Sequence, residues 1–482
     1  MGSLVLALTV GLLGALPPPG ATPVPAKLDP KLFDRAVNDY DRHDVRSAAP
    51  KFYEFLKSAA STDENYAWAQ YFLGKSLVEL KLRHAAAVYF AKVPRERTNP
   101  EVLPRALKEL QEMVEFPHDE MLIDEQIFQA LDLGLLADGT ADFAQYQQGM
   151  VDLRRGFNRW ARGHFSKLTE GTSEASRARM AMVVNDIQES KEATPAMVQT
   201  FQALSADPKI SPTIRNEAIL AVARLQYERK EYEQAFSSYE KVQLPPLSPG
   251  RATLYLEEAW TQYQLGHLHE SMGLLTTLDA PSFRDEFLPD KYLLRAFIFR
   301  DLCYYLPAKR AAKELTRRFA DSLEAIRERS DLTQDPRMRR AAISRGTAKK
   351  SAHFLEALDS ESERLGRYAG SFGPAFFTHL TKLYSLERGE ASRVANQKLE
   401  EAVREEADKL LQAAEQVRLM DYEVGIKLYE RIKKNSKLSD TLPEVPLSPT
   451  QASFRFGGEY WNDELRNYRF SLKSRCIEER NP

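Results

Sequence analysis

The sequence contains few cysteines and no surplus of charge of either sign. Cys303 and Cys476 are the only cysteines among 482 residues, too few for a disulfide-dense scaffold or a zinc site made of thiolates alone. Lys and Arg number 67 against 69 Asp and Glu. A dedicated nucleic-acid binder needs a basic surplus to displace counterions from phosphates. We therefore expect no nucleic acid among the partners.

Apolar runs long enough to cross a bilayer are also lacking. The run from Leu4 to Leu16 has 13 residues and no charge, whereas a spanning helix needs about 20. It fits the apolar core of a secretory signal peptide, although no Lys or Arg precedes it, and Val24-Pro25-Ala26 supplies the small residues that a signal peptidase reads. We expect a signal peptide at 1–26, a periplasmic location and no transmembrane segment in the mature chain.

Export would change how the two cysteines are interpreted. In an oxidising periplasm Cys303 and Cys476 can form one disulfide. The alternative is a buried thiol at Cys303, beside Phe299, Tyr304 and Tyr305, and a separate thiol at Cys476. Spacing in the sequence cannot decide between them, because it does not set the distance between the two Cα atoms.

Helical signals dominate between Asp29 and Ser439, where apolar residues recur at spacings of three and four. Ala235, Ser271 and Ala308 hold the same place in three successive segments, 36 and 37 residues apart. The following apolar positions match as well, and an earlier block shows the same pattern. They are Tyr239 and Val242, Leu275 and Leu278, Ala312 and Leu315, then Val37, Tyr40, Ala49 and Tyr53, and Leu73, Gly74, Ala86, Phe90 and Val93.

This pattern resembles the tetratricopeptide repeat (TPR), a helix–turn–helix unit of about 34 residues. The best copy is 232–242, with the small Ala235 where the two helices cross and the aromatic Tyr239 one turn later. One hairpin cannot bury its own apolar face, so each copy packs on the next. The resemblance covers about five copies. It implies an all-α fold, a TPR-like helical solenoid.

The patterns divide the chain into six parts. They are a signal peptide at 1–26, TPR-like repeats at 27–95, an irregular helical region at 96–210, TPR-like repeats at 211–320, charged long helices at 321–440, and a Pro-rich linker with an aromatic tail at 441–482.

Dense alternating charge marks the long helices. Within 397–434, Leu399, Val403, Ala407, Leu410 and Ala414 recur at helical spacing. We expect a long exposed helix, or one arm of a coiled-coil hairpin whose apolar seam faces a partner.

Aromatic residues are concentrated in the tail: Phe454, Phe456, Tyr460, Trp461, Tyr468 and Phe470. The alternation of Tyr468, Phe470 and Leu472 with polar residues is typical of a short strand. Two arrangements stay open. The tail either folds back as a cap with Trp461 buried, or offers an edge strand to a partner.

No motif predicts catalysis, a cofactor or a metal site. Gln188-Glu189-Ser190 resembles the core of the lytic transglycosylases, but the Gly-Leu-Met-Gln segment of that family is absent. An enzyme with an unrecognised site between Glu101 and Leu204 is the alternative. A deep pocket with converging carboxylates would support it.

Lys309 to Lys350 holds 13 Lys and Arg against 6 Asp and Glu. This segment either contacts an anionic lipid, glycan or acidic partner, or presents solvated helix faces.

The TPR resemblance implies a binding groove lined by the first helix of each copy. Carried over to this chain, the groove residues are Leu220, Arg224 and Tyr227, then Leu256, Trp260 and Tyr263, then Leu293, Phe297 and Arg300. Aromatic residues and Arg are enriched at protein-binding hot spots. Alternatively another part of the chain, such as the aromatic tail, fills the groove.

The segment from Gly458 to Phe470, with Ser474-Arg475-Cys476, is similar to the end of repeat proteins of delta-proteobacterial gliding-motility machinery. That resemblance implies a non-catalytic scaffold in a periplasmic or envelope-spanning complex, with envelope proteins as partners. A peptidoglycan-binding helper of cell-wall metabolism is one alternative. A cytoplasmic TPR regulator is the other, if 1–26 is not a signal peptide.

Overall fold

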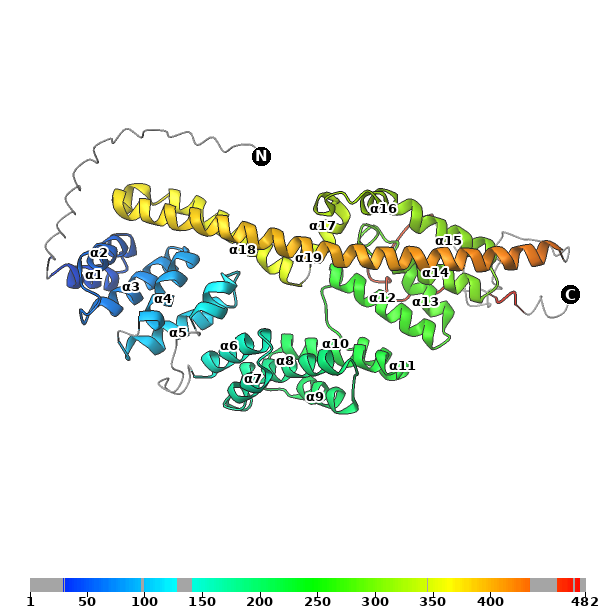
Figure 1. Cartoon of the computed structure of the whole chain (residues 1–482), viewed down its shortest axis with the longest axis horizontal. Coiled ribbons are helices and arrows are strands. Elements are labelled where there is room, and N and C mark those ends of the chain that lie inside the picture. The colour runs from blue at the N-terminus through cyan, green and yellow to red at the C-terminus, as the bar shows by residue number, and fades with distance from the viewer. Residues whose placement is uncertain are drawn as a thin grey trace, which may run out of the picture.

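The computed structural model describes residues 29, 31–96, 99–127, 141–344, 346–433, 457–470 and 473–476. Every regular element within these residues is helical, and none is a strand. The helices stack as antiparallel pairs along the chain, with two long helices laid across them (Figure 1). The all-α solenoid predicted from the sequence is therefore confirmed. The expected signal peptide at 1–26 lies outside the described residues.

Two helical hairpins form the first repeat block. They are α1 (Leu32–Asp41) with α2 (Val45–Ser58), and α3 (Tyr66–Glu79) with α4 (Arg83–Glu96). Their shared core includes Phe52, Leu73 and Phe90, all fully buried. A Cβ on Gly74 would overlap the ring of Phe90, so glycine at this crossing lets α3 and α4 approach closely.

The middle region is helical without a regular repeat. Its elements are α5 (Val102–Met113), the π-helix η1 (Met121–Gln126), α6 (Ala141–Arg154), α7 (Asn158–Phe165), α8 (Ser173–Ser190) and α9 (Pro195–Ala206), after which the hairpin of α10 (Pro212–Glu228) and α11 (Tyr232–Tyr239) begins the second repeat block. The starts of α9 and α10 follow local rules. Thr194 and Ser211 each accept a hydrogen bond from a backbone N–H of the first turn, and proline follows both.

The second repeat block continues with α12 (Pro249–Gln264), α13 (Leu268–Thr277), α14 (Asp290–Asp301) and α15 (Tyr305–Arg318). The aligned small residues Ala235, Ser271 and Ala308 are all fully buried. The Ser271 hydroxyl donates to the carbonyl of Ala259 at 2.7 Å, so it also joins the two helices of its hairpin. The repeat pattern in the sequence thus marks the positions where paired helices cross.

The remaining helices lead into a long hairpin. They are α16 (Ala320–Arg327), the short 3-10 helix η3 (Leu332–Gln334), α17 (Pro336–Ile343), α18 (Gly346–Gly366) and α19 (Ala369–Lys433). Gly373, at φ 69°, breaks α19 near its start, and Pro374 follows. From there the helix is continuous to Lys433, about 90 Å at 1.5 Å per residue. It runs along the longest axis of the molecule, past both repeat blocks (Figure 1).

The apolar seam of α19 packs on the chain itself. Its first half buries Phe376, Leu380 and Tyr384 in the core of the first repeat block. Its second half buries Val403 and Leu410 against α14, α15 and α17. The expectation that this seam faces a partner is therefore wrong. The repeats leave an apolar face open, and the long helix is the nearest apolar surface that can cover it.

The described tail residues, 457–470 and 473–476, form turns and no strand. They lie against α13, where Leu465 is buried while Trp461 stays 63% exposed. The expected strand is thus absent from the described part of the tail, and Trp461 is not the buried anchor. Neighbouring helices have already used their backbone groups, so a strand would find no ladder of partners. Phe454, Phe456 and the prolines of the linker lie outside the described residues.

Close contact between the tail and α13 depends on a glycine. A Cβ on Gly273 would overlap the backbone carbonyl of Tyr468. Arg466 adds an ion pair to the buried Glu258 of α12 at 3.1 Å, and burial raises the pKa of Glu258 to about 7. The tail therefore packs mainly on α13, the second helix of its repeat, and reaches α12 through one ion pair.

Among the residues that the structure describes, no helix is both long enough and apolar enough to span a bilayer.

Candidate functional site

A groove opens between the first helices of the second repeat block and α19. Its cavity has a volume of about 500 Å³ and receives side chains from α10, α11, α12, α14 and α19. The residues that line it are Arg224, Tyr227, Glu228, Tyr239, Glu257, Trp260, Asp290, Leu293, Gln412, Ala413 and Gln416. Four of these, Arg224, Tyr227, Trp260 and Leu293, are groove residues predicted from the TPR resemblance.

An aromatic cluster continues from this groove along α12 and α14. The rings of Trp260 and Tyr263 meet edge to face at 5.8 Å, and Phe297 lies 6.2 Å from Trp260. The Arg300 guanidinium lies 4.7 Å from the centre of the Phe297 ring and pairs with Glu423 of α19 at 3.3 Å. The long helix is therefore tied to the end of the predicted stripe.

The polar side chains of the groove carry a negative balance. Arg224 makes a bidentate contact with Glu257, at 2.8 and 3.1 Å, which leaves the carboxylates of Glu228 and Asp290. Burial raises the pKa of Asp290, as expected for a carboxyl group with little access to water. A ligand that carries one basic group beside apolar surface would complement this lining.

The other predicted groove residues occupy different surroundings. Leu256 is buried in the hydrophobic core, and Leu220 packs against the core around Tyr239. Repeat spacing correctly predicts the helix face on which these two leucines lie. How far each side chain is buried depends on which helix packs against that face. Nothing in the repeat pattern could have located Gln412, Ala413 and Gln416, since α19 joins the groove from 119 or more positions further along the chain. The described tail does not fill the groove; a helix of the chain forms one wall of it.

Cys303 and Cys476 form a disulfide in the structure, with 5.3 Å between their Cα atoms. Cys303 adopts a left-handed conformation, φ 61°, in the turn between α14 and α15. The tail next to Cys476 is held by further contacts. The Tyr304 hydroxyl donates to the carbonyl of Lys473 at 2.6 Å, and the backbone N–H of Arg475 donates to the carbonyl of Leu302 at 3.0 Å.

A second cavity, of about 590 Å³, lies between η1, α6, α18 and α19. Within it Asp119, just before η1, shares a hydrogen bond with Glu387 of α19. Nε2 of the buried His84 lies 3.7 Å from Oε2 of Glu387. Burial, aided by the charge of Asp119, raises the pKa of Glu387 to about 7, and burial raises the pKa of Asp119 as well. Two carboxyl groups thus converge in a pocket partly built from the irregular region.

Direct pairing of these carboxyl groups requires a proton between them, because two adjacent carboxylates repel. The raised pKa of Glu387 means that the folded chain holds a proton that the unfolded chain releases above about pH 4.5. The folded state is therefore penalised as the pH rises from about 4.5 to about 7, and the penalty stays above that.

Replacing Glu387 with Gln removes the titrating group but keeps a hydrogen-bond donor toward Asp119. We expect E387Q to match the wild-type chain in stability at pH 5 and to exceed it at pH 8, by about 1 to 2 kcal/mol. Chemical denaturation at both pH values measures the difference. E405Q, an exposed glutamate on the same helix, is the control and should show no such change. Equal stability of E387Q and wild type at pH 8 would contradict the shared proton.

The part of the chain that the structure describes contains no group of three or more His, Cys, Asp or Glu arranged to hold a metal ion.

No known protein family and no curated protein matches the chain. The solved structures that match the chain include two at low identity. The structure of yeast Tom70 is 11% identical, with 84% of this chain and 98% of that chain covered and a TM-score of 0.27. The APC/C hetero-tetramer Cut9–Hcn1 is 12% identical, with 80% and 89% covered and a TM-score of 0.21. At these scores the fold assignment rests on the helices of this chain alone.

Proposed function

We propose that this chain is a non-catalytic scaffold that binds a segment of a protein partner in the groove between α10, α12, α14 and α19. The observation that carries the proposal is the convergence of Arg224, Tyr227, Trp260 and Leu293, from three successive first helices, on one cavity of about 500 Å³. An aromatic floor with carboxylates at its edge suits a segment that presents a basic residue next to an apolar one.

A second surface supports a scaffold. Near its end α19 carries large apolar side chains that are 43–72% exposed: Leu419, Tyr422, Ile426, Tyr429 and Ile432. Exposed apolar side chains grouped in this way are typical of protein–protein contacts. One face of α19 closes the groove, and another is available to a protein outside the chain.

The finer proposal is a place in the periplasm, within an envelope-spanning complex such as a gliding-motility machine. The Cys303–Cys476 disulfide supports it, since disulfides persist in oxidising compartments and are rare in the cytosol. The motif from Gly458 to Cys476 supports the link to motility. A cytoplasmic regulator is the weaker alternative, because the reducing cytosol would not favour this disulfide.

Affinity purification from cross-linked envelopes, with mass spectrometry of the captured proteins, tests the scaffold. We expect Trp260→Ala and Glu228→Lys each to reduce capture of the groove partner at least about tenfold, because truncation or charge reversal at a hot spot costs 1.4 kcal/mol or more. The controls are Trp160→Ala and Glu233→Lys, which change exposed residues outside the groove. Unchanged capture by both groove variants would refute the proposal.

A cell-wall role is the second candidate, and the converging carboxyl groups of Asp119 and Glu387 are the observation that favours it. Purified sacculi provide the test. Retention of the chain on sacculi, with no protein captured, would indicate a peptidoglycan-binding helper. Release of soluble muropeptides by the wild-type chain but not by E387Q would indicate an enzyme, with Glu387 as a general acid.

A further inference from the structure

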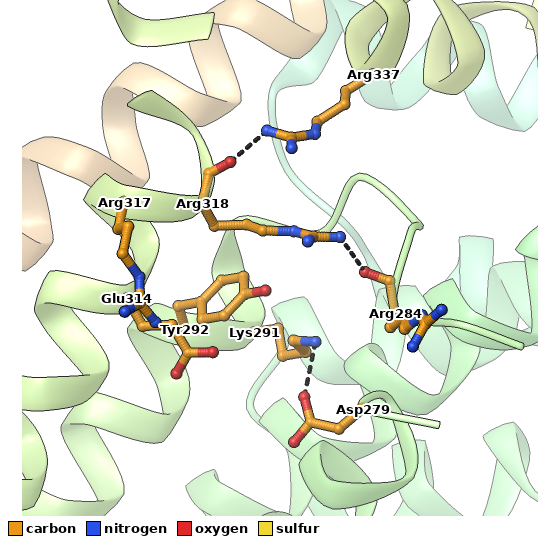
Figure 2. A pocket seen from close by; sticks show the side chains of 8 residues that line it. All are labelled: Asp279, Arg284, Lys291, Tyr292, Glu314, Arg317, Arg318 and Arg337. Atoms are coloured by element: carbon orange, nitrogen blue, oxygen red, sulfur yellow. Dashed lines mark hydrogen bonds and ion pairs between the residues drawn. The ribbon is translucent and has the colours of Figure 1, made fainter. Parts of the chain in front are cut away.

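A basic cavity lies on the second repeat block, outside the groove. It has a volume of about 380 Å³, and Figure 2 shows the side chains that line it. They come from the loop after α13, from α14, from the end of α15 and from the start of α17. The lining residues are Asp279, Arg284, Lys291, Tyr292, Glu314, Arg317, Arg318 and Arg337.

Cations outnumber carboxylates in this cavity. Five Lys and Arg side chains face Asp279 and Glu314, a net charge of +3. Asp279 is already shared, because it pairs with Lys291 at 3.0 Å and with Arg295, outside the cavity, at 2.6 Å. Glu314 also lies 4.0 Å from Arg295. Both carboxylates of the cavity, those of Asp279 and Glu314, therefore already lie beside other cations. The remaining guanidinium groups have no counter-charge inside the cavity.

Backbone carbonyls orient two of these cations. Arg318 donates to the carbonyl of Arg284 at 2.9 Å, and Arg337 donates to the carbonyl of Arg318 (Figure 2). A carbonyl directs a guanidinium group but does not neutralise it. Arg318 also pairs with Asp285 at 2.9 Å, at the exposed side of the loop. Since a guanidinium carries five N–H donors, both groups keep donors for a ligand.

The remaining cations complete the lining. Lys291 is only 4% exposed, and its Nζ donates to the carbonyl of Leu278 at 3.1 Å. Burial lowers the pKa of Lys291, which a nearby anion would offset. Arg284 and Arg317 are exposed and have no side-chain partner among the described residues.

We propose that this cavity binds a phosphate-type oxyanion group, carried either by a small phosphorylated molecule or by a lipid headgroup. Guanidinium groups bind phosphate oxygens in pairs, and several of them from different elements surround a tetrahedral anion. The site accounts for part of the basic surplus between Lys309 and Lys350. Arg317, Arg318 and Arg337 gather at the cavity, while Arg284 joins from the loop after α13 and Lys291 from α14.

Inorganic pyrophosphate, titrated calorimetrically into the full chain at low salt, is the first probe. We expect the wild-type chain to bind it, with an affinity that falls as salt is added. R284Q/R317Q removes two exposed cations of the cavity and should weaken binding at least about tenfold. R339Q/R340Q removes two exposed cations of α17 that do not line the cavity, and should change binding less than about twofold.

Vesicles distinguish the two sources of the anion. Cosedimentation with phosphatidylglycerol vesicles but not with phosphatidylcholine vesicles, abolished by R284Q/R317Q, would support a lipid headgroup. Pyrophosphate binding without cosedimentation would support a small phosphorylated molecule. Absence of binding to pyrophosphate and to anionic vesicles would overturn the proposal. An equal loss in the two double variants would also overturn it, because it would show an effect of net charge alone.

Discussion

Replacing Cys303 and Cys476 with serine is expected to release the described tail from α13 and to lower the stability of the second repeat block. The disulfide joins residues that are 173 positions apart. In the loop-closure model, a cross-link over that length lowers the entropy of the unfolded state. This raises the free energy of unfolding by about 5 kcal/mol at most.

Local contacts alone hold the tail weakly once the bond is gone. Leu465 remains the only fully buried apolar side chain of the described tail, and its carbonyl accepts a hydrogen bond from the Thr277 hydroxyl. Arg466 keeps its ion pair with Glu258. One buried leucine and a few polar contacts contribute about 2 to 4 kcal/mol of binding free energy against the loss of conformational entropy when the tail is ordered on α13. The tail should therefore open frequently while the helices remain folded.

Three measurements check this expectation. Limited proteolysis should cut C303S/C476S within 457–476 much faster than the oxidised wild type. Hydrogen exchange should rise in α13, whereas helical content by circular dichroism should be unchanged. Reductant provides the control, because it should reproduce the effect in the wild-type chain and leave the serine variant as it was. A wild-type chain whose proteolysis does not respond to reductant would contradict a structural role for the bond.

Leu410→Ala is expected to destabilise the chain by about 3 kcal/mol, and Leu411→Ala by less than about 1 kcal/mol. The two leucines are adjacent on α19 and chemically identical, but Leu410 is fully buried while Leu411 is 43% exposed. Leu410 fills the core formed with α14, α15 and α17. Its truncation leaves a cavity that the surrounding helices can close only in part.

The same pair of variants tests whether α19, which forms one wall of the groove, contributes to partner binding. Ala413 and Gln416 lie within two turns of Leu410 and line the groove, so loosening α19 at this point should also weaken partner capture. Denaturant titration gives the loss of stability, and hydrogen exchange locates it in α14, α15 and α19. If L410A and L411A behave alike, α19 does not pack on the second repeat block as the structure has it.

The repeat architecture could be predicted because its determinants are local. A small residue recurs where two helices cross, at Ala235, Ser271 and Ala308, and each of these positions is fully buried. Apolar residues follow one turn later and face the next hairpin. Such a pattern depends only on helical periodicity and on nearest neighbours along the chain. Copies of the pattern can be recognised in the sequence even though they share few residues with the tetratricopeptide repeat that they resemble.

The candidate groove could be predicted only in part. Trp260 and Arg224 lie on the helix face that the repeat pattern selects. Leu256 lies on the same face by spacing but is buried in the core. The contribution of Gln412 and Gln416 requires knowledge of where α19 lies. Periodicity determines which face of a helix turns inward, but not which distant element will cover that face.

The tail shows the same limit more sharply. Alternation of Tyr468 and Phe470 predicted a strand, and one of the two arrangements left open placed Trp461 in a buried site. In the structure the tail meets helices, whose backbone groups have no capacity for a ladder, and the smaller Leu465 occupies the buried site on α13. Alternation of apolar and polar residues indicates that one side of a segment contacts an apolar surface. Whether a strand forms depends on whether that surface offers free backbone groups.

The sequence by itself determined the helices, their pairing into repeats, the dense charge in the second half of α19, and the residue types that the first helices bring to the groove. Each of these follows from contacts within a few turns. Only the tertiary structure decided that α19 covers the chain's own repeats, that Cys303 meets Cys476, that Asp119 meets Glu387, and that basic side chains from three helices and a loop surround one cavity. Those contacts join residues far apart in the chain, and they form because a solenoid leaves an apolar face that the free energy of burial drives another element to cover.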